Sequence, residues 1–266
     1  MIKRPSPEIV ALVRRCVERF VGMQAVDRAV ALASLGFTAI VPLFVIVGAV
    51  LPGDRGLADA LVNRFHLRGS SADLVRQVVA QPDATKQALS WLGVALLIVS
   101  ALSFTRALQR VYEQSWRLEA LGARGTPAGL VWIAGIVVWI ALFAAARRAL
   151  IDATGPVVAL IVVLAGNGVL WLATPYVLLS RRLRWRALVP TAALTTIAMT
   201  VLSAASVIYM PNAIDESAAR YGPIGIAIAL LSWLVAIGFV LVTSAAVGAE
   251  LVAGRAGAPT TSARAG

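Results

Sequence analysis

The feature that most constrains this chain is a series of long apolar stretches without a charged residue in their middle. A helix needs about 20 apolar residues to cross the hydrocarbon core of a bilayer. Six stretches reach or nearly reach that length, at about 29–52, 88–105, 128–147, 156–180, 187–210 and 222–250. We therefore predict an all-α, polytopic membrane protein with about six transmembrane helices.

Composition points the same way. Of the 266 residues, 59% are hydrophobic and only 14% are charged, whereas soluble domains carry roughly 25% charged residues. The net charge of +11 would suggest nucleic acid in a soluble protein. Here the basic residues lie between the apolar stretches, so we interpret them as topology signals and as contacts for anionic lipid headgroups, with no nucleic-acid partner.

The basic residues also predict an orientation. With the N-terminus inside, 16 Lys and Arg fall in cytoplasmic segments and 8 in outer segments. Cytoplasmic loops are the ones enriched in Lys and Arg. The sequence therefore predicts an even number of spans, both termini in the cytoplasm and no cleavable signal peptide, because the chain stays polar through Arg28.

The segments outside the spans have their own patterns. Residues 1–28 predict an amphipathic helix that Ser6 caps and Pro7 begins. Its apolar face either lies on the inner headgroups or packs against the protein, and the sequence leaves both open. The outer loop 53–87 predicts a small helical hairpin, and the tail 253–266 predicts disorder. This leaves 29–252 as one transmembrane domain.

A few residues within the spans are candidates for function. Pro42 and Pro175 each remove a backbone hydrogen bond from a predicted helix. Such a proline can form a hinge or expose a carbonyl to a cavity, although simple accommodation by neighbouring helices is the preferred interpretation. Asn167, flanked by Gly166 and Gly168, favours a hydrogen bond to another helix, and contact with a substrate is the alternative.

Two further candidates lie at the ends of the last span. Tyr221 and Gly222 precede Pro223, a combination that predicts a tight turn into the sixth span. Glu250 lies near the inner end of that span, where the helix dipole disfavours a carboxylate. We expect a structural ion pair for it, with Arg28 or the 181–186 arginine cluster as partner.

Catalytic chemistry has little support. Cys16 and His66 are the only residues of their kinds, so an intrachain disulfide and a His/Cys zinc cluster are excluded. The uncharged spans also argue against a carboxylate-driven pump. We therefore expect that the protein is not an enzyme and has no catalytic, metal or cofactor site.

Three segments together carry a family resemblance. They are Ala31–Ser34 running into Ala39–Leu43, Leu183–Pro190 with Arg184 inside it, and Tyr221-Gly222 followed by Gly248–Leu251. In order and spacing over about residues 10–252, they resemble the YihY/BrkB-like membrane proteins, formerly labelled ribonuclease BN-like. Thr191 and Gln109-Arg110 depart from the usual pattern.

The resemblance implies a six-span protein of the bacterial inner membrane. The old nuclease label would need metal ligands or an acid–base pair, which this sequence does not offer. The leading hypothesis is a transporter or flippase-like exporter of an envelope lipid or other amphiphile. The alternative is a non-transporting scaffold for cell-envelope machinery, and a small-solute channel is third. Besides lipids, a second copy of the chain or an envelope protein stays open as a partner.

Overall fold

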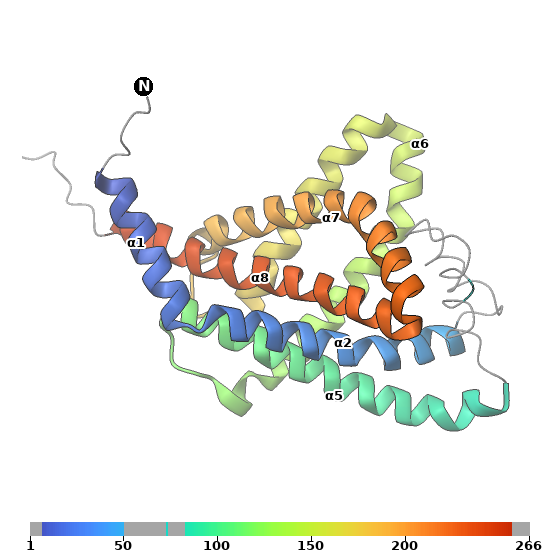
Figure 1. The fold of residues 1–266 in the computed structure, drawn as a ribbon. Helices are drawn as coiled ribbons and strands as arrows, with labels where there is room; N and C mark the ends of the chain where they lie inside the picture. Colours follow the sequence, from blue (N-terminus) through green and yellow to red (C-terminus); the bar gives the residue numbers. More distant parts are fainter. Residues whose placement is uncertain (1–6, 51–72, 74–82, 257–266) are drawn as a thin grey trace, which may run out of the picture. The chain divides into compact units, whose positions relative to one another are not determined.

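The computed structural model describes residues 7–50, 73 and 83–256. Within these residues the chain is helical apart from short turns, and no strand occurs among them (Figure 1). The elements are α1 (Pro7–Gly22), α2 (Ala25–Val50), α5 (Asp83–Ser115), the 3-10 turn η1 (Gly122–Gly125), α6 (Thr126–Leu178), α7 (Trp185–Tyr221) and α8 (Pro223–Ala256). The predicted all-α class is confirmed for this part of the chain.

Four helical stretches in the described residues are long and apolar enough to cross a bilayer. They are Val94–Ser115, Leu160–Leu178, Trp185–Tyr221 and Ile224–Gly254. The broken pair of α1 and α2 adds a fifth if it counts as one span. The described residues thus give four or five spans, and the count of six stays a prediction.

Large apolar side chains lie on the outside of these helices. Val99, Ile161 and Ile208 are 61%, 60% and 75% exposed, whereas Thr191 and Thr195 are buried. Water would favour the opposite arrangement, because exposed aliphatic surface is costly in water and costless in hydrocarbon. The distribution is that of helices whose outer surface meets lipid, so the chain is a multi-pass membrane protein.

The helices extend beyond the apolar stretches that predicted them. α5 begins at Asp83, inside the expected outer loop, and continues past Arg106 to Ser115 as the sequence predicted. α7 runs to Tyr221 and α8 to Ala256, into the tail that was expected to be disordered. Hydropathy marks where lipid begins and ends, whereas backbone hydrogen bonding continues into water. The rest of the predicted outer hairpin and tail, 51–72, 74–82 and 257–266, lies outside the described residues.

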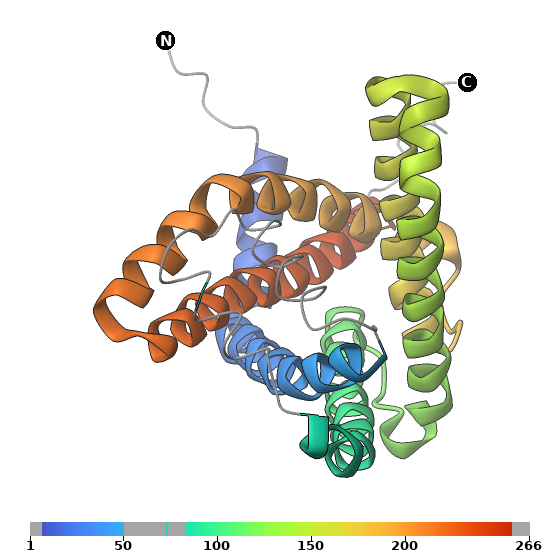
Figure 2. The ribbon, with the colours of Figure 1, turned by 90° about the vertical axis from the view of Figure 1, so that its right-hand side faces the viewer.

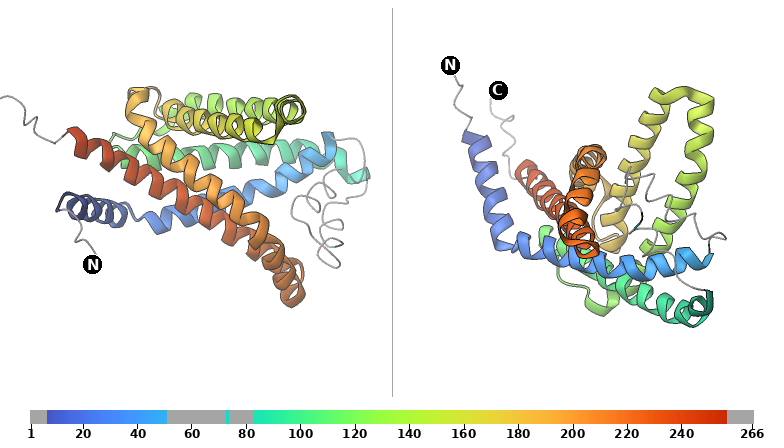
Figure 3. Two further views of the ribbon diagram at one scale, coloured as in Figure 1. Left: turned by 90° about the horizontal axis from the view of Figure 1, so that it is seen from above. Right: turned by 45° about the vertical axis from the view of Figure 1, so that its right-hand side comes forward.

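Helix α6 is two helices joined at a single residue. Gly155 has φ 78° and ψ 169°, a conformation that lets 126–154 and 156–178 fold back on each other. The two arms run side by side (Figures 2 and 3). Trp132 Nε1 on the first arm donates a 3.2 Å hydrogen bond to the buried Thr174 Oγ1 on the second. The sequence predicted two spans here, and the structure shows that almost no loop separates them.

The described residues divide into two compact units, and the single transmembrane domain 29–252 stays a prediction. The first unit contains the described residues up to Asp27 together with 108–198 and 240–256. The second unit contains the described residues of 28–107 together with 199–239. Helices α5, α7 and α8 each contribute residues to both units.

The second unit is organised around the turn between α7 and α8. Gly222 has φ 60°, and its N–H donates to Ala218 O at 2.8 Å, so the predicted tight turn is confirmed. Beyond the turn, Gly225 permits the closest approach of α8 to the Ser217 carbonyl. A small core of Met210, Ile214 and Ala229 lies just inside this turn, and Trp233 packs against it.

Candidate functional site

The end of α5 forms the centre of the first unit. Leu108, Val111 and Tyr112 are each 1% exposed, and the polar Gln109 and Glu113 are also buried. Buried polar side chains need hydrogen-bond partners. The partners of these two residues define the first polar cluster.

Glu113 holds three groups together. Its Oε1 accepts hydrogen bonds from Gln109 Nε2 at 2.8 Å, Leu121 N at 3.0 Å and Arg182 Nη2 at 3.1 Å. Arg182 in turn donates to Glu119 O at 2.8 Å. The carboxylate therefore connects α5, the loop that follows it and the turn after α6 through one buried oxygen.

Gly125 lies against this cluster. A Cβ at this position would lie 2.8 Å from the side-chain Cδ of Gln109, so a larger residue would force the Gln109 amide to shift. We call Gln109, Glu113, Gly125 and Arg182 the Glu113 cluster.

A second buried carboxylate, Glu250, anchors α1. Glu250 Oε1 lies 3.4 Å from Arg117 Nη2 and 3.9 Å from Arg19 Nε. Arg19 also donates to Gln114 O and to Ser115 O. The expected ion pair of Glu250 is present, but these arginines form it, whereas Arg182 of the expected 181–186 cluster pairs with Glu113.

The groups around Glu250 line a polar cavity of about 180 Å³ together with Arg15 and Glu18. Burial lowers the pKa of Arg19. The positive charge of Arg117 lowers it further, and the Glu250 carboxylate opposes the shift. Burial and the Glu250 carboxylate raise the pKa of the neighbouring Cys16 thiol. Three arginines around one carboxylate explain why the negative charge tolerates this position.

The raised pKa of Cys16 predicts its reactivity. Only the thiolate reacts with a maleimide or haloacetamide, so the alkylation of Cys16 should reach half of its maximal rate at a pH above that of a free thiol. Glu250→Gln removes a negative charge and should move this midpoint to lower pH. A rate that rises equally at every pH would indicate only better access, and an unchanged midpoint would contradict the electrostatic link.

Helix α1 presents two different apolar stripes. Leu12, Cys16 and Phe20 are half-buried. A second stripe is exposed, with exposed fractions of 53% or more, and consists of Val10, Val13, Val17 and Val21. The sequence left open whether α1 packs on the protein or faces lipid; one stripe packs on the protein, and the other is available for lipid.

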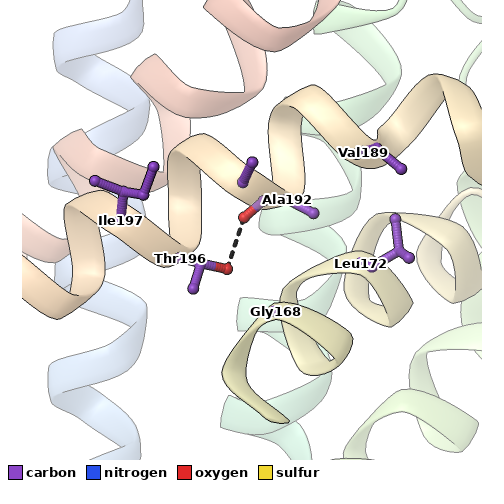
Figure 4. A pocket seen from close by; sticks show the side chains of 7 residues that line it. Gly168, Leu172, Val189, Ala192, Thr196 and Ile197 are labelled. Atoms are coloured by element: carbon purple, nitrogen blue, oxygen red, sulfur yellow. Dashed lines mark hydrogen bonds between the residues drawn. The ribbon is translucent and has the colours of Figure 1, made fainter. Parts of the chain in front are cut away.

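An apolar groove of about 350 Å³ lies between the second arm of α6 and the first part of α7 (Figure 4). Gly168 and Leu172 form one wall. Small or aliphatic residues of α7 form the other: Val189, Ala192, Ala193, Thr196 and Ile197. A Cβ on Gly168 would have only Thr196 Oγ1 within 4 Å, at 3.9 Å, so the groove is open at this glycine.

The polar groups near the groove do not make it polar. Thr196 Oγ1 donates to Ala192 O at 2.7 Å, which satisfies its hydroxyl within the helix (Figure 4). Asn167 is half-buried beside Gly168, and within the described residues its amide has no hydrogen-bond partner. The expected hydrogen bond from Asn167 to another helix is thus not formed in this part of the structure.

Basic residues lie at the end of the groove where α7 begins. Arg181 stacks on Tyr176, 6.0 Å from its ring centroid, and Arg182 belongs to the Glu113 cluster. Arg184 and Arg186 are exposed and have no acidic partner among the described residues. Arg186 lies 5.4 Å from the ring centroid of Trp185, which is itself 53% exposed.

The remaining residues singled out from the sequence are not among those that line the groove. Pro42 lies inside α2, which continues through it. Pro175 is buried in the last turn of α6, where its carbonyl accepts from Leu179 N at 2.9 Å. Tyr221 and Gly222 belong to the turn of the second unit. The structure does not bring these residues together into one site.

Sequence reasoning missed the Glu113 cluster. Glu113 follows a span and lies near Arg106, Arg110 and Arg117, so it resembled a solvent-exposed charge. The available signal was local: Gln109 and Glu113 are four residues apart on a helix face. Burial of that face depends on α6 and its following turn, which are distant in sequence.

The family comparison covers nearly the whole chain. The family model described as virulence factor BrkB matches residues 16–265. Searches of curated proteins and of solved structures find no match. Together with the lipid-facing helices, the family match leads to one conclusion: the chain belongs to the BrkB virulence factor family, also called YihY/BrkB, and is a multi-pass membrane protein.

Proposed function

We propose that this protein moves an envelope lipid or another amphiphile across the bacterial inner membrane. The observation that carries the proposal is the apolar groove between α6 and α7, which ends at exposed arginines. An amphiphile needs both an apolar surface for its chain and a polar surface for its headgroup. This groove offers the two side by side.

The character of the spans supports lipid rather than ion-coupled movement. The middle of every apolar stretch is free of charge, whereas proton and ion coupling commonly uses ionisable residues within the membrane. Among the described residues, no three His, Cys, Asp or Glu side chains lie close enough to hold a metal. The driving force we propose is therefore the lipid gradient itself.

The orientation belongs to the same proposal. Both termini lie in the cytoplasm, which the twofold excess of Lys and Arg on that side favours. In this orientation Arg184 and Arg186 face the inner leaflet, where anionic lipids attract basic residues. The lipid would enter the groove from that leaflet.

Reconstitution tests the proposal. Purified protein in vesicles containing a fluorescent phosphatidylglycerol should make the inner-leaflet label accessible to an external quencher faster than in protein-free vesicles. Equal rates in the two preparations would contradict lipid movement. Reproducible crosslinking to one envelope protein, combined with equal rates, would favour the scaffold instead.

A further inference from the structure

We propose that the α6–α7 groove binds an acyl chain of an anionic phospholipid whose phosphate is held by Arg184 and Arg186. This inference deepens the proposed function by naming the lipid class and its binding site. It depends on three observations: the length of the groove along α7, the face of α7 that carries it, and the two arginines without a carboxylate partner at its end.

The length of the groove along α7 fits an acyl chain. The α7 wall extends from Val189 to Ile197, which are eight residue steps apart, or about 12 Å along the helix axis. One leaflet of hydrocarbon is about 15 Å deep, half of the bilayer core. The groove therefore runs from one turn below the start of α7 to near the middle of the bilayer, where Gly168 lies opposite.

The face of α7 connects the groove to the basic end. Arg186, Val189 and Ala193 are spaced at i, i+3 and i+7, so they share one helix face. The Arg186 side chain therefore leaves α7 on the same face as the groove wall, and its guanidinium lies 5.4 Å from the Trp185 ring centroid. Trp185, half-exposed beside it, is the kind of aromatic residue that lies at headgroup level.

The unpaired charges favour a phosphate. Arg182 forms an ion pair with Glu113, and Arg117 forms one with Glu250. The exposed Arg184 and Arg186 have no carboxylate partner in the part of the chain that is described. Guanidinium groups bind phosphate through paired hydrogen bonds, and they are weakly hydrated. An anionic phospholipid places its phosphate at this level when its chain fills the groove.

The groove lining excludes a polar occupant. The hydroxyl of Thr196 is bonded to Ala192 O, and the other lining side chains are aliphatic or absent. A peptide or sugar would lose its hydrogen bonds to water here without replacement, at about 1–3 kcal/mol for each buried group. A hydrocarbon chain loses none.

Photolabelling tests this assignment. The probes are phosphatidylglycerol and phosphatidylcholine, each with a diazirine in one acyl chain, in vesicles of phosphatidylethanolamine. Gly168→Trp fills the groove, and Gly135→Trp is the matched control. Gly135 lies on the exposed face of the first arm of α6, where a Cβ would meet no atom within 4 Å.

In the wild type, the phosphatidylglycerol label should concentrate on the segments 166–173 and 189–197. Arg184→Gln with Arg186→Gln should weaken this labelling about tenfold, as expected for loss of one or two charge-assisted hydrogen bonds. Phosphatidylcholine labelling should change little. Gly168→Trp should remove the groove label, and Gly135→Trp should retain it.

Two results would overturn the assignment. Labelling that is spread evenly over all lipid-facing helices and is insensitive to Gly168→Trp would exclude a groove site. Groove labelling that is equal for both lipids would exclude the phosphate contact. Because labelling reports occupancy without movement, its failure is distinguishable from failure of the translocation assay.

Discussion

Glu113→Ala is expected to lower the free energy of unfolding by about 1–3 kcal/mol, the cost of leaving a buried polar group without its hydrogen-bond partner. The substitution leaves Arg182 without its carboxylate and Gln109 and Leu121 N without their acceptor. Arg182 keeps its hydrogen bonds to Leu179 O and Glu119 O, so the cost arises mainly at the buried Gln109 amide and at Leu121 N. Unfolding in mixed micelles, followed by circular dichroism, measures it.

Two variants make this result specific. Glu113→Gln keeps an oxygen that can accept from Leu121 N but loses the charge, so it should cost less than alanine. Glu119→Ala removes a carboxylate from an exposed side chain only six residues away, while its backbone carbonyl still accepts from Arg182. We expect almost no change from it. Equal losses for Glu113→Ala and Glu119→Ala would contradict the buried cluster.

Gly248→Ala is expected to cost about 3 kcal/mol, the upper end of the range for overpacked cores. A Cβ at this position would lie 2.6 Å from the Cα of Thr191 and still closer to its hydroxyl. Thr191 is fully buried, and its backbone cannot move aside as a flexible side chain could. The substitution must therefore push α8 away from α7.

The matched control is Gly135→Ala, since the space around Gly135 is open. Alanine there should leave stability unchanged or raise it by about 0.5–1 kcal/mol, because glycine is a poor helix residue. Combining Gly248→Ala with Thr191→Gly should recover part of the loss. If the two alanine variants unfold alike, the close packing of α7 on α8 in the first unit is wrong.

The sequence predicted the features that depend on local patterns. The continuation of α5 past Arg106 followed from Leu108, Val111 and Tyr112, which proved to be buried on the expected face. The Gly222 turn followed from the residues themselves. In both places the physical cause lies within a few residues along the chain.

Features that depend on distant neighbours were not predictable. Nothing near Glu250 indicates that Arg19, more than 200 residues earlier, would be its partner. The groove is lined by Gly168 on α6 and Ala192 on α7, and such small residues are common in membrane helices with no groove. The length of α7 was underestimated because its polar last turns resemble a loop.

The proposal that the α6–α7 groove carries lipid is tested most directly by the translocation rate of fluorescent phosphatidylglycerol in vesicles with three proteins. These are the wild type, Gly168→Trp and Gly135→Trp, reconstituted at equal density. The account predicts that Gly135→Trp retains the wild-type rate and that Gly168→Trp falls to the rate of protein-free vesicles. Equal rates for the two tryptophan variants, or a wild type no faster than empty vesicles, would contradict it.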